Sequence, residues 1–486
     1  MVDQNESLRA HAVRGSKWTA ISAIAGGGLQ LAQLAVLGRL LEPSDFGLMA
    51  MMMVAIGFGN AIADFGLGNY LVQSEELCQR ALNRLLLTAL AMSVAMAGAV
   101  ALSASAAATY YQAPQLSIML PWLSMAIVGS TLSQMLLALL QRAFEFKTIA
   151  VGEIASVLTA LILAILLAMA GCGVWALVAG QLAAGASRLL VFLPKFLNLR
   201  RGLPIGGHGQ SYKVGGFIFF QTGERLLNYV GWNMDKLILG RFAGDIALGT
   251  YTVAYQLMIR PFSVLNPIFT RVALPLFSRI KSDDARLISG YLQMLQVIAV
   301  LSFPIYVGIS IAAPGITFLV MGQKWADSAP VLALLSVMGM FFSIGNPIGV
   351  LALAKGKPQW TFYSNLVSLL VYTLAFTIGA QFGVMGVAWA FVLAGVFILF
   401  PMEFLIRYLL VGMVGGQYLK ALMHLFIAAV LPLFAHGIWL VLRCEALGPW
   451  QSLFWGCCAM LFFYSYVWLF DRPVLIGVKN LILKGR

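Results

Sequence analysis

Ionisable side chains gather in a few strongly apolar segments of the chain, where charges are costly and usually serve a function. One aspartate lies in segment 46–73, four charged residues lie in segment 214–240 and two arginines lie in segment 247–277: Asp64, Glu224, Arg225, Asp235, Lys236, Arg260 and Arg271. Residues eleven apart on a helix differ by only about 20°, because three turns take about 10.8 residues. Glu224 and Asp235 therefore share one helical stripe, Arg225 and Lys236 share the next, and Arg260 and Arg271 share a third.

Arg225 and Arg260 both fall near the middle of their segments, so two adjacent antiparallel helices would bring their guanidinium groups to one level. Guanidinium groups match phosphate oxygens in a bidentate way. We therefore expect a substrate-binding site for an anion, formed by Arg225, Lys236, Arg260 and Arg271. The acidic residues Asp64, Glu224 and Asp235 are then candidates for coupling to an ion.

A structural role for these charges is the alternative. Glu224 with Arg271, or Asp235 with Lys236 from a neighbouring helix, would lock two helices together as a buried ion pair. Asp64 has a further alternative, because the glycines that follow it could free backbone amides for its carboxylate to accept. The offset between the two repeats described below favours a binding role, since Arg225 corresponds to Ala23 and Arg260 to Phe58.

The segments that hold these residues belong to a very apolar chain. Hydrophobic residues make up 61% and charged residues 10% of the 486 residues, with a mean hydropathy of +0.89. Soluble domains average roughly 45–50% and about 25%. This composition excludes a soluble enzyme, a nucleic-acid-binding module and a disordered protein, and it predicts an all-α polytopic membrane protein.

Fourteen stretches are long and apolar enough to span a bilayer. They cover 18–40, 46–73, 84–110, 117–140, 149–170, 174–193, 214–240, 247–277, 291–319, 329–354, 360–381, 384–406, 418–442 and 450–470. We expect two pseudo-symmetric six-helix bundles, at 18–199 and 214–410, joined by a cytoplasmic linker at 200–213. Two further transmembrane helices occupy 411–470. The chain would begin with a cytoplasmic segment at 1–17 and end with a cytoplasmic amphipathic tail at 471–486.

The net charge of +13 is explained by topology. With a cytoplasmic N-terminus, inner loops and tails hold 22 basic residues, Arg407 among them, whereas outer loops hold four. This bias follows the positive-inside rule and places both termini in the cytoplasm. The five basic residues that remain inside spans are Arg188 and the four proposed to bind the anion.

An internal repeat supports the two bundles. A Leu-Gly-Arg motif followed by a glycine occurs twice with an offset of 202 residues, and its structural residues are Gly38, Arg39 and Gly47, then Gly240, Arg241 and Gly249. Both copies fall where the first helix of a bundle turns into the second. Parallel repeats of this kind are one of the known transporter architectures.

Sites for other chemistry are missing from the sequence. The five cysteines form no CxxC pair, and no metal motif, catalytic triad or phosphate-binding loop occurs. We therefore expect no catalytic residues, no metal, no cofactor and no nucleic-acid partner.

The motifs resemble those of polysaccharide transporters. The stretches Leu37–Leu48, Asp64–Gly68 and Asn233–Arg241 look like landmarks of Wzx-type lipid-linked oligosaccharide flippases in the multidrug/oligosaccharidyl-lipid/polysaccharide exporter superfamily. The likeness is greatest to colanic-acid and other exopolysaccharide exporters.

The resemblance implies a non-enzymatic flippase of the bacterial plasma (inner) membrane. Its substrate would be an oligosaccharide linked to undecaprenyl diphosphate, moved by alternating access, with a proton or sodium gradient as the driving force in many relatives. Membrane lipid, a polysaccharide polymerase and a co-polymerase are the candidate partners, and the working unit would be a monomer. A cation-coupled multidrug exporter is the first alternative, but it would favour an acidic cavity. A membrane-embedded glycosyltransferase or polymerase is the second, but it would need a large outer loop.

Overall fold

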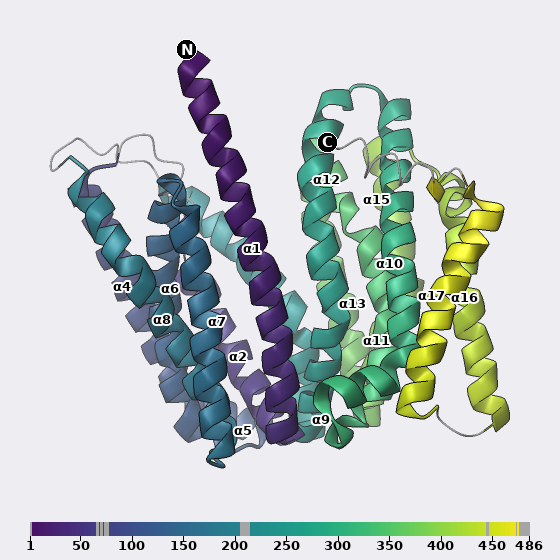
Figure 1. Ribbon diagram of the computed structural model, residues 1–486, viewed down its shortest axis with the longest axis horizontal. Helices are drawn as coiled ribbons and strands as arrows, with labels where there is room; N and C mark the ends of the chain where they lie inside the picture. Colours follow the sequence, from purple (N-terminus) through teal and green to yellow (C-terminus); the bar gives the residue numbers. More distant parts are fainter. Residues whose placement is uncertain are drawn as a thin grey trace. The chain divides into compact units, whose positions relative to one another are not determined.

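The computed structural model describes residues 2–64, 68, 71, 77–204, 214–443, 447–472, 474 and 475. Within these ranges the chain is helical and contains no strand (Figure 1). Eleven of the helical segments are long and apolar enough to cross a membrane. The protein is therefore an all-α, multi-pass membrane protein, which confirms the predicted fold class.

The eleven segments account for twelve of the expected spans, because the run Gln359–Val411 covers two of them. Its parts α13 (Gln359–Gly379) and α14 (Gly383–Ala394) pack on each other, with a turn at Gly383, where φ is +72°. The two remaining expected spans both fall in one long helix, α9 (Val214–Ile280). Helix α2 (Pro43–Ala63) ends before the predicted limit of the second span at 73, with Asp64 as its C-cap residue. Most of 65–73 lies outside the described residues.

Two compact units make up the chain, Met1–Ile246 and Ala247–Arg486. The first contains the following helices and the first part of α9: α1 (Val2–Leu40), α2 (Pro43–Ala63), α4 (Gln79–Leu102), α5 (Ala104–Tyr111), α6 (Leu116–Arg142), α7 (Phe146–Met169) and α8 (Val174–Arg201). The predicted linker at 200–213 does not coincide with the division of the chain after Ile246. The linker and the limits of the two six-helix bundles therefore stay predictions.

Small residues let the helices of the first unit pack closely. Helices α7 and α8 contact each other along much of their length, and a Cβ at Gly152 would lie 2.2 Å from the Phe192 ring. Nearby, Phe192 and Phe196 of α8 join Leu139 of α6 in the hydrophobic core. Because lipid is as apolar as the core, such close van der Waals packing is what holds these helices together.

Helix α9 runs from Val214 to Ile280 and is interrupted at Gly244, where φ is +81° and ψ is −172°. Only glycine adopts this backbone conformation readily. Three prolines, Pro261, Pro267 and Pro275, follow inside the second part of the helix. The interruption separates the expected seventh span from the eighth, as the sequence predicted.

The second unit contains the other part of α9 and the following helices: α10 (Asp284–Met321), η1 (Gln323–Trp325), α11 (Ser328–Gly345), α12 (Pro347–Ala354), α13 (Gln359–Gly379), η2 (Ala380–Phe382), α14 (Gly383–Ala394), η3 (Gly395–Leu399), α15 (Phe400–Val411), α16 (Gly415–Arg443) and α17 (Pro449–Phe470). Helix α17 lies along α10, with α16 beside them (Figure 1). Gly308 and Gly456 allow this approach, since a Cβ on Gly456 would lie 2.9 Å from the Gly308 carbonyl oxygen. Most of the tail predicted at 471–486 lies outside the described residues.

Candidate anion-binding site

An ion pair joins the second and seventh predicted spans inside the first unit. Nη1 of Arg225, in α9, donates to Oδ2 of Asp64, at the end of α2. The two side chains are 33% and 37% exposed, so neither is sealed inside the unit. The sequence analysis singled out both residues but did not predict that they pair with each other.

A tyrosine one helical turn further along α9 fixes the same two helices. The hydroxyl of Tyr229 lies 3.0 Å from the Met53 carbonyl oxygen and 3.1 Å from that of Val54, and its single proton can be donated to either. Gly57 makes room for it, because a Cβ there would lie 2.1 Å from the hydroxyl oxygen. Glycine in the second span therefore allows α2 and α9 to pack closely.

Four polar residues continue this face of α9: Arg225, Tyr229, Asn233 and Lys236. Their spacing of four, four and three residues places them on one stripe of the helix. The Lys236 ammonium donates to Oδ1 of Asn233 at 2.9 Å, and the Asn233 amide donates to the Tyr229 carbonyl oxygen at 2.9 Å. The stripe therefore presents two cations, with two hydrogen-bonding side chains between them.

Asp235 does not belong to this stripe of α9. It is only 5% exposed, and its carboxylate accepts the backbone N–H of Lys236 at 2.8 Å. Its predicted part in ion coupling stays a hypothesis. Glu224 was predicted to share a stripe with Asp235, and Arg271 with Arg260. The side chains of Glu224 and Arg271 lie outside the described part of the structure.

Arg260 belongs to the second unit, in the second part of α9. Its backbone carbonyl oxygen accepts the Ser263 hydroxyl at 2.8 Å. Arg225 belongs to the first unit and Arg260 to the second. That their guanidinium groups lie at one level of the membrane therefore stays a prediction.

The repeated glycine motif has a packing role in its first copy. A Cβ on Gly47 would lie 1.9 Å from the backbone oxygen of Asp245, directly after the break in α9. Arg241 of the second copy lies over the Tyr110 ring, with 5.8 Å between its guanidinium carbon and the ring centroid. Both contacts lie within the first unit. Gly38, Gly240 and Gly249 are buried, whereas Arg39 is exposed.

A second charged cluster was missed by the sequence analysis and lies in the second unit. Arg407 was assigned to an inner loop, but it belongs to α15 and its side chain is 0% exposed. Its Nη2 donates to Glu403 at 2.8 Å, and its Nε donates to the Tyr291 hydroxyl at 3.1 Å. The Tyr418 ring lies 4.7 Å from the guanidinium carbon, which gives a cation–π contact.

This cluster ties α15 to α10 and α16, because Tyr291 and Tyr418 come from those two helices. The sequence signal that could have found it is the Glu403–Arg407 spacing of four residues, which forms ion pairs on a helix. The partners from other helices carry no such signal. An arginine this deeply buried is poorly placed to bind a substrate, and we assign it a structural role.

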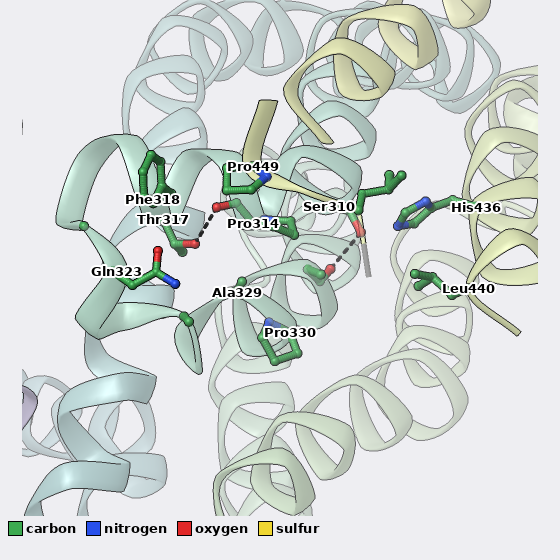
Figure 2. Close-up of a pocket in the computed structure, with 14 residues that line it drawn as sticks. Ser310, Pro314, Thr317, Phe318, Gln323, Ala329, Pro330, His436, Leu440 and Pro449 are labelled. Atoms are coloured by element: carbon green, nitrogen blue, oxygen red, sulfur yellow. Dashed lines mark hydrogen bonds between the residues drawn. The ribbon is translucent and has the colours of Figure 1, made fainter. Parts of the chain in front are cut away.

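A cavity of about 380 Å³ also lies in the second unit, and it is mainly apolar. Figure 2 shows His436 and Leu440 of α16 facing Ser310 of α10 across it. The Ser310 hydroxyl donates to the Ala333 carbonyl oxygen at 2.9 Å. No arginine, lysine, aspartate or glutamate lines this cavity, so it does not have the chemistry of the predicted anion site.

Among the described residues, no group of three or more histidine, cysteine, aspartate or glutamate side chains is placed so that it could hold a metal ion.

Comparison with known proteins identifies the family. A family model described as "Polysaccharide biosynthesis protein" matches residues 36–330. The chain belongs to this family. The matched region begins before the first Leu-Gly-Arg motif and ends after the second. It therefore includes Asp64, Arg225 and Arg260.

Two curated relatives cover nearly the whole chain. The lipopolysaccharide biosynthesis protein WzxC of Escherichia coli is 30% identical over 98% of this chain and 97% of its own length. The teichuronic acid biosynthesis protein TuaB of Bacillus subtilis is 29% identical over 89% of this chain and 90% of its own length. Among solved structures, the lipid II flippase MurJ in an inward closed conformation matches with a TM-score of 0.74. That match covers 95% of this chain and 100% of the MurJ chain at 13% identity, and it shows that the two share a fold.

Proposed function

We propose that this protein is a flippase that moves an oligosaccharide linked to undecaprenyl diphosphate from the inner to the outer leaflet of the bacterial plasma membrane. Membership of the polysaccharide biosynthesis family carries the proposal, together with a 30% identical relative that aligns over nearly the whole chain. The product would be an exopolysaccharide or a related surface polysaccharide. The process moves its substrate and breaks no covalent bond, so the protein is a transporter and not an enzyme.

The charges of the first unit support an anionic substrate. Arg225 and Lys236 lie on one stripe of α9, inside a helix that is otherwise largely apolar. Arginine forks and lysine ammonium groups both bind phosphate oxygens. We propose that Arg225 and Lys236 bind the diphosphate together with Arg260 and Arg271, while the polyprenyl chain stays in the lipid.

The remaining features follow the same scheme. Both termini lie in the cytoplasm, a proton or sodium gradient drives alternating access, and the protein acts as a monomer beside a polymerase and a co-polymerase. A multidrug exporter that takes cationic drugs is the second candidate, and the basic stripe of α9 opposes it because like charges repel.

Deletion of the gene tests the proposal directly. We expect lipid-linked repeat units to accumulate on the cytoplasmic leaflet, where a membrane-impermeant reagent added to intact cells cannot reach them. Wild-type protein and the Arg188→Gln variant should restore the polymer, whereas Arg225→Gln should not. Unchanged polymer and unchanged lipid-linked intermediates in the deletion strain would exclude the function.

A further inference from the structure

Two asparagines from different helices meet inside the apolar spans of the second unit. Nδ2 of Asn346, directly after α11, donates to Oδ1 of Asn266, in the second part of α9. With Ser263 and Thr270 they form a cluster of uncharged polar side chains. From this juxtaposition we infer that the polar cluster binds hydroxyl groups in the sugar part of the substrate. The inference rests on the proposed function and adds to it a saccharide-binding site and the residues that form it.

Helices α9 and α11 run side by side in the same direction, which brings the two asparagines together. The Ser328 hydroxyl, at the start of α11, donates to the Thr250 carbonyl oxygen at 3.2 Å. Further along both helices, the ring centroids of Phe262 and Phe342 lie 6.3 Å apart. The two asparagines come one helical turn after these rings, so their contact continues an established line of packing.

The buried ion pair of the second unit holds the end of α11 in place. Nη2 of Arg407 lies 3.5 Å from the Ile344 carbonyl oxygen, and a Cβ on Gly345 would lie 2.8 Å from Oε1 of Glu403. Ile344 and Gly345 are buried, whereas Asn346 is exposed. The backbone that carries Asn346 is therefore fixed while its amide stays accessible, as a binding residue requires.

Two hydroxyl groups lie on the same side of α9 as Asn266. Spacings of three and four residues place Ser263, Asn266 and Thr270 on one stripe of the helix. The Ser263 hydroxyl donates to the Arg260 carbonyl oxygen at 2.8 Å, and the Thr270 hydroxyl donates to the Asn266 carbonyl oxygen at 3.1 Å. Both protons are therefore used within the helix, and both hydroxyl oxygens remain as acceptors.

The two amides add donors to these acceptors. Each asparagine amide has two N–H groups and one carbonyl oxygen, so their mutual bond leaves three N–H groups and the side-chain oxygen of Asn346. Neither amide makes another hydrogen bond to a described residue. A sugar hydroxyl both donates and accepts, so uncharged donors and acceptors side by side match it, whereas a phosphate favours cations. The partly exposed rings of Phe262 and Phe342 supply the apolar surface on which the C–H groups of a sugar ring can pack.

The opposite side of this part of α9 has the character of a lipid-facing surface. Val264 and Ile268 are 66% and 58% exposed, and both lie about 160° around the helix from Asn266. An amide that faced hydrocarbon would leave its N–H and C=O groups without partners, which is unfavourable. Asn346 is exposed within an apolar span, Ser328–Ala354, and we therefore place the polar cluster on a side that water and substrate reach.

The test compares two lipids that differ in their sugars. The glycosylated probe is the lipid-linked repeat unit purified from the gene-deletion strain, and the sugar-free probe is undecaprenyl diphosphate. The affinity of each is measured for the full chain in nanodiscs. Wild type is compared with Asn346→Leu, Thr270→Val and Thr377→Val.

Thr377→Val is the matched control. The Thr377 hydroxyl, in α13, donates to the carbonyl oxygen four residues earlier at 2.7 Å, as the Thr270 hydroxyl does at 3.1 Å. The two substitutions remove the same kind of bond, but only Thr270 belongs to the polar cluster. A thermal unfolding scan checks that each variant is folded, and Thr270→Val decides the outcome if Asn346→Leu does not fold.

We expect wild type and Thr377→Val to bind the glycosylated lipid at least about tenfold more tightly than undecaprenyl diphosphate. Asn346→Leu should lose about tenfold and Thr270→Val about threefold in affinity for the glycosylated lipid, with little change for the sugar-free lipid.

A role confined to helix packing would lower the unfolding temperature of these variants but leave the ratio of the two affinities unchanged. An unchanged ratio in the folded variants would overturn the inference and leave the proposed function intact. Absence of saturable binding of either lipid by folded wild type would overturn the proposed substrate class, and the inference with it.

Discussion

Loss of the Glu403 charge should destabilise the second unit more than the loss of any exposed charge. Glu403→Gln keeps the shape of the side chain but leaves the Arg407 guanidinium, which is 0% exposed, without its counter-ion. Breaking one half of a buried ion pair costs about 3–5 kcal/mol. Because the Glu403 side chain is 22% exposed, solvent screens part of the loss, and we expect about 3 kcal/mol.

The double variant Glu403→Leu with Arg407→Leu separates this cost from a general effect of mutation. It removes both charges together, and buried ion pairs replaced by apolar residues are often neutral or even stabilising. The Tyr291 hydroxyl loses its donor in this variant, which costs about 1 kcal/mol. The double variant should therefore be more stable than Glu403→Gln alone.

Unfolding of the purified protein in a mild detergent, titrated with sodium dodecyl sulfate and followed by tryptophan fluorescence, provides the measurement. The chain has 11 tryptophans to report the transition. A loss below about 1 kcal/mol for Glu403→Gln would equal that of an exposed pair. That result, or equal stability of the single and double variants, would refute the assignment of Glu403 and Arg407 as a structural ion pair.

Three further outcomes are expected. Gly57→Ala should displace Tyr229 and cost about 1–3 kcal/mol by overpacking, whereas Gly98→Ala, with no atom within 4 Å of the new Cβ, should change the unfolding midpoint little. Arg225→Ala and Arg260→Ala should each abolish polymer export at a normal level of membrane-inserted protein, and normal polymer yield from both would exclude a cationic substrate site. Reporter fusions at both termini should be active only in their cytoplasmic forms, because basic residues concentrate in the loops on that side, and a periplasmic signal from either would contradict the topology.

The sequence was sufficient for the membrane character and for the polar positions on the seventh span. Bilayer thickness fixes the length of a span, so apolar stretches of about 20 residues reveal helices without any tertiary information. Helical periodicity likewise placed Arg225 and Lys236 on one stripe, because it depends only on residues in the same helix. Even so, α2 ended at Ala63, earlier than its apolar pattern indicated.

Partners from different helices could not be derived in this way. The sequence named Asp64 and Arg225 separately, 161 residues apart, and nothing in either segment indicates that their side chains meet. Arg407 was misplaced for the same reason. Its position near the end of an apolar stretch is typical of a loop residue, whereas two tyrosines from other helices and one glutamate allow it to be buried.

By itself, then, the sequence determined which segments are long and apolar enough to span a membrane and which residues within a helix share a face. These properties follow from hydropathy and from the local geometry of the helix. Only the tertiary structure decided which charge neutralises which, because ion pairing depends on the packing of helices that are distant in the chain. That packing made Arg225, one of two cations on its stripe, the partner of Asp64.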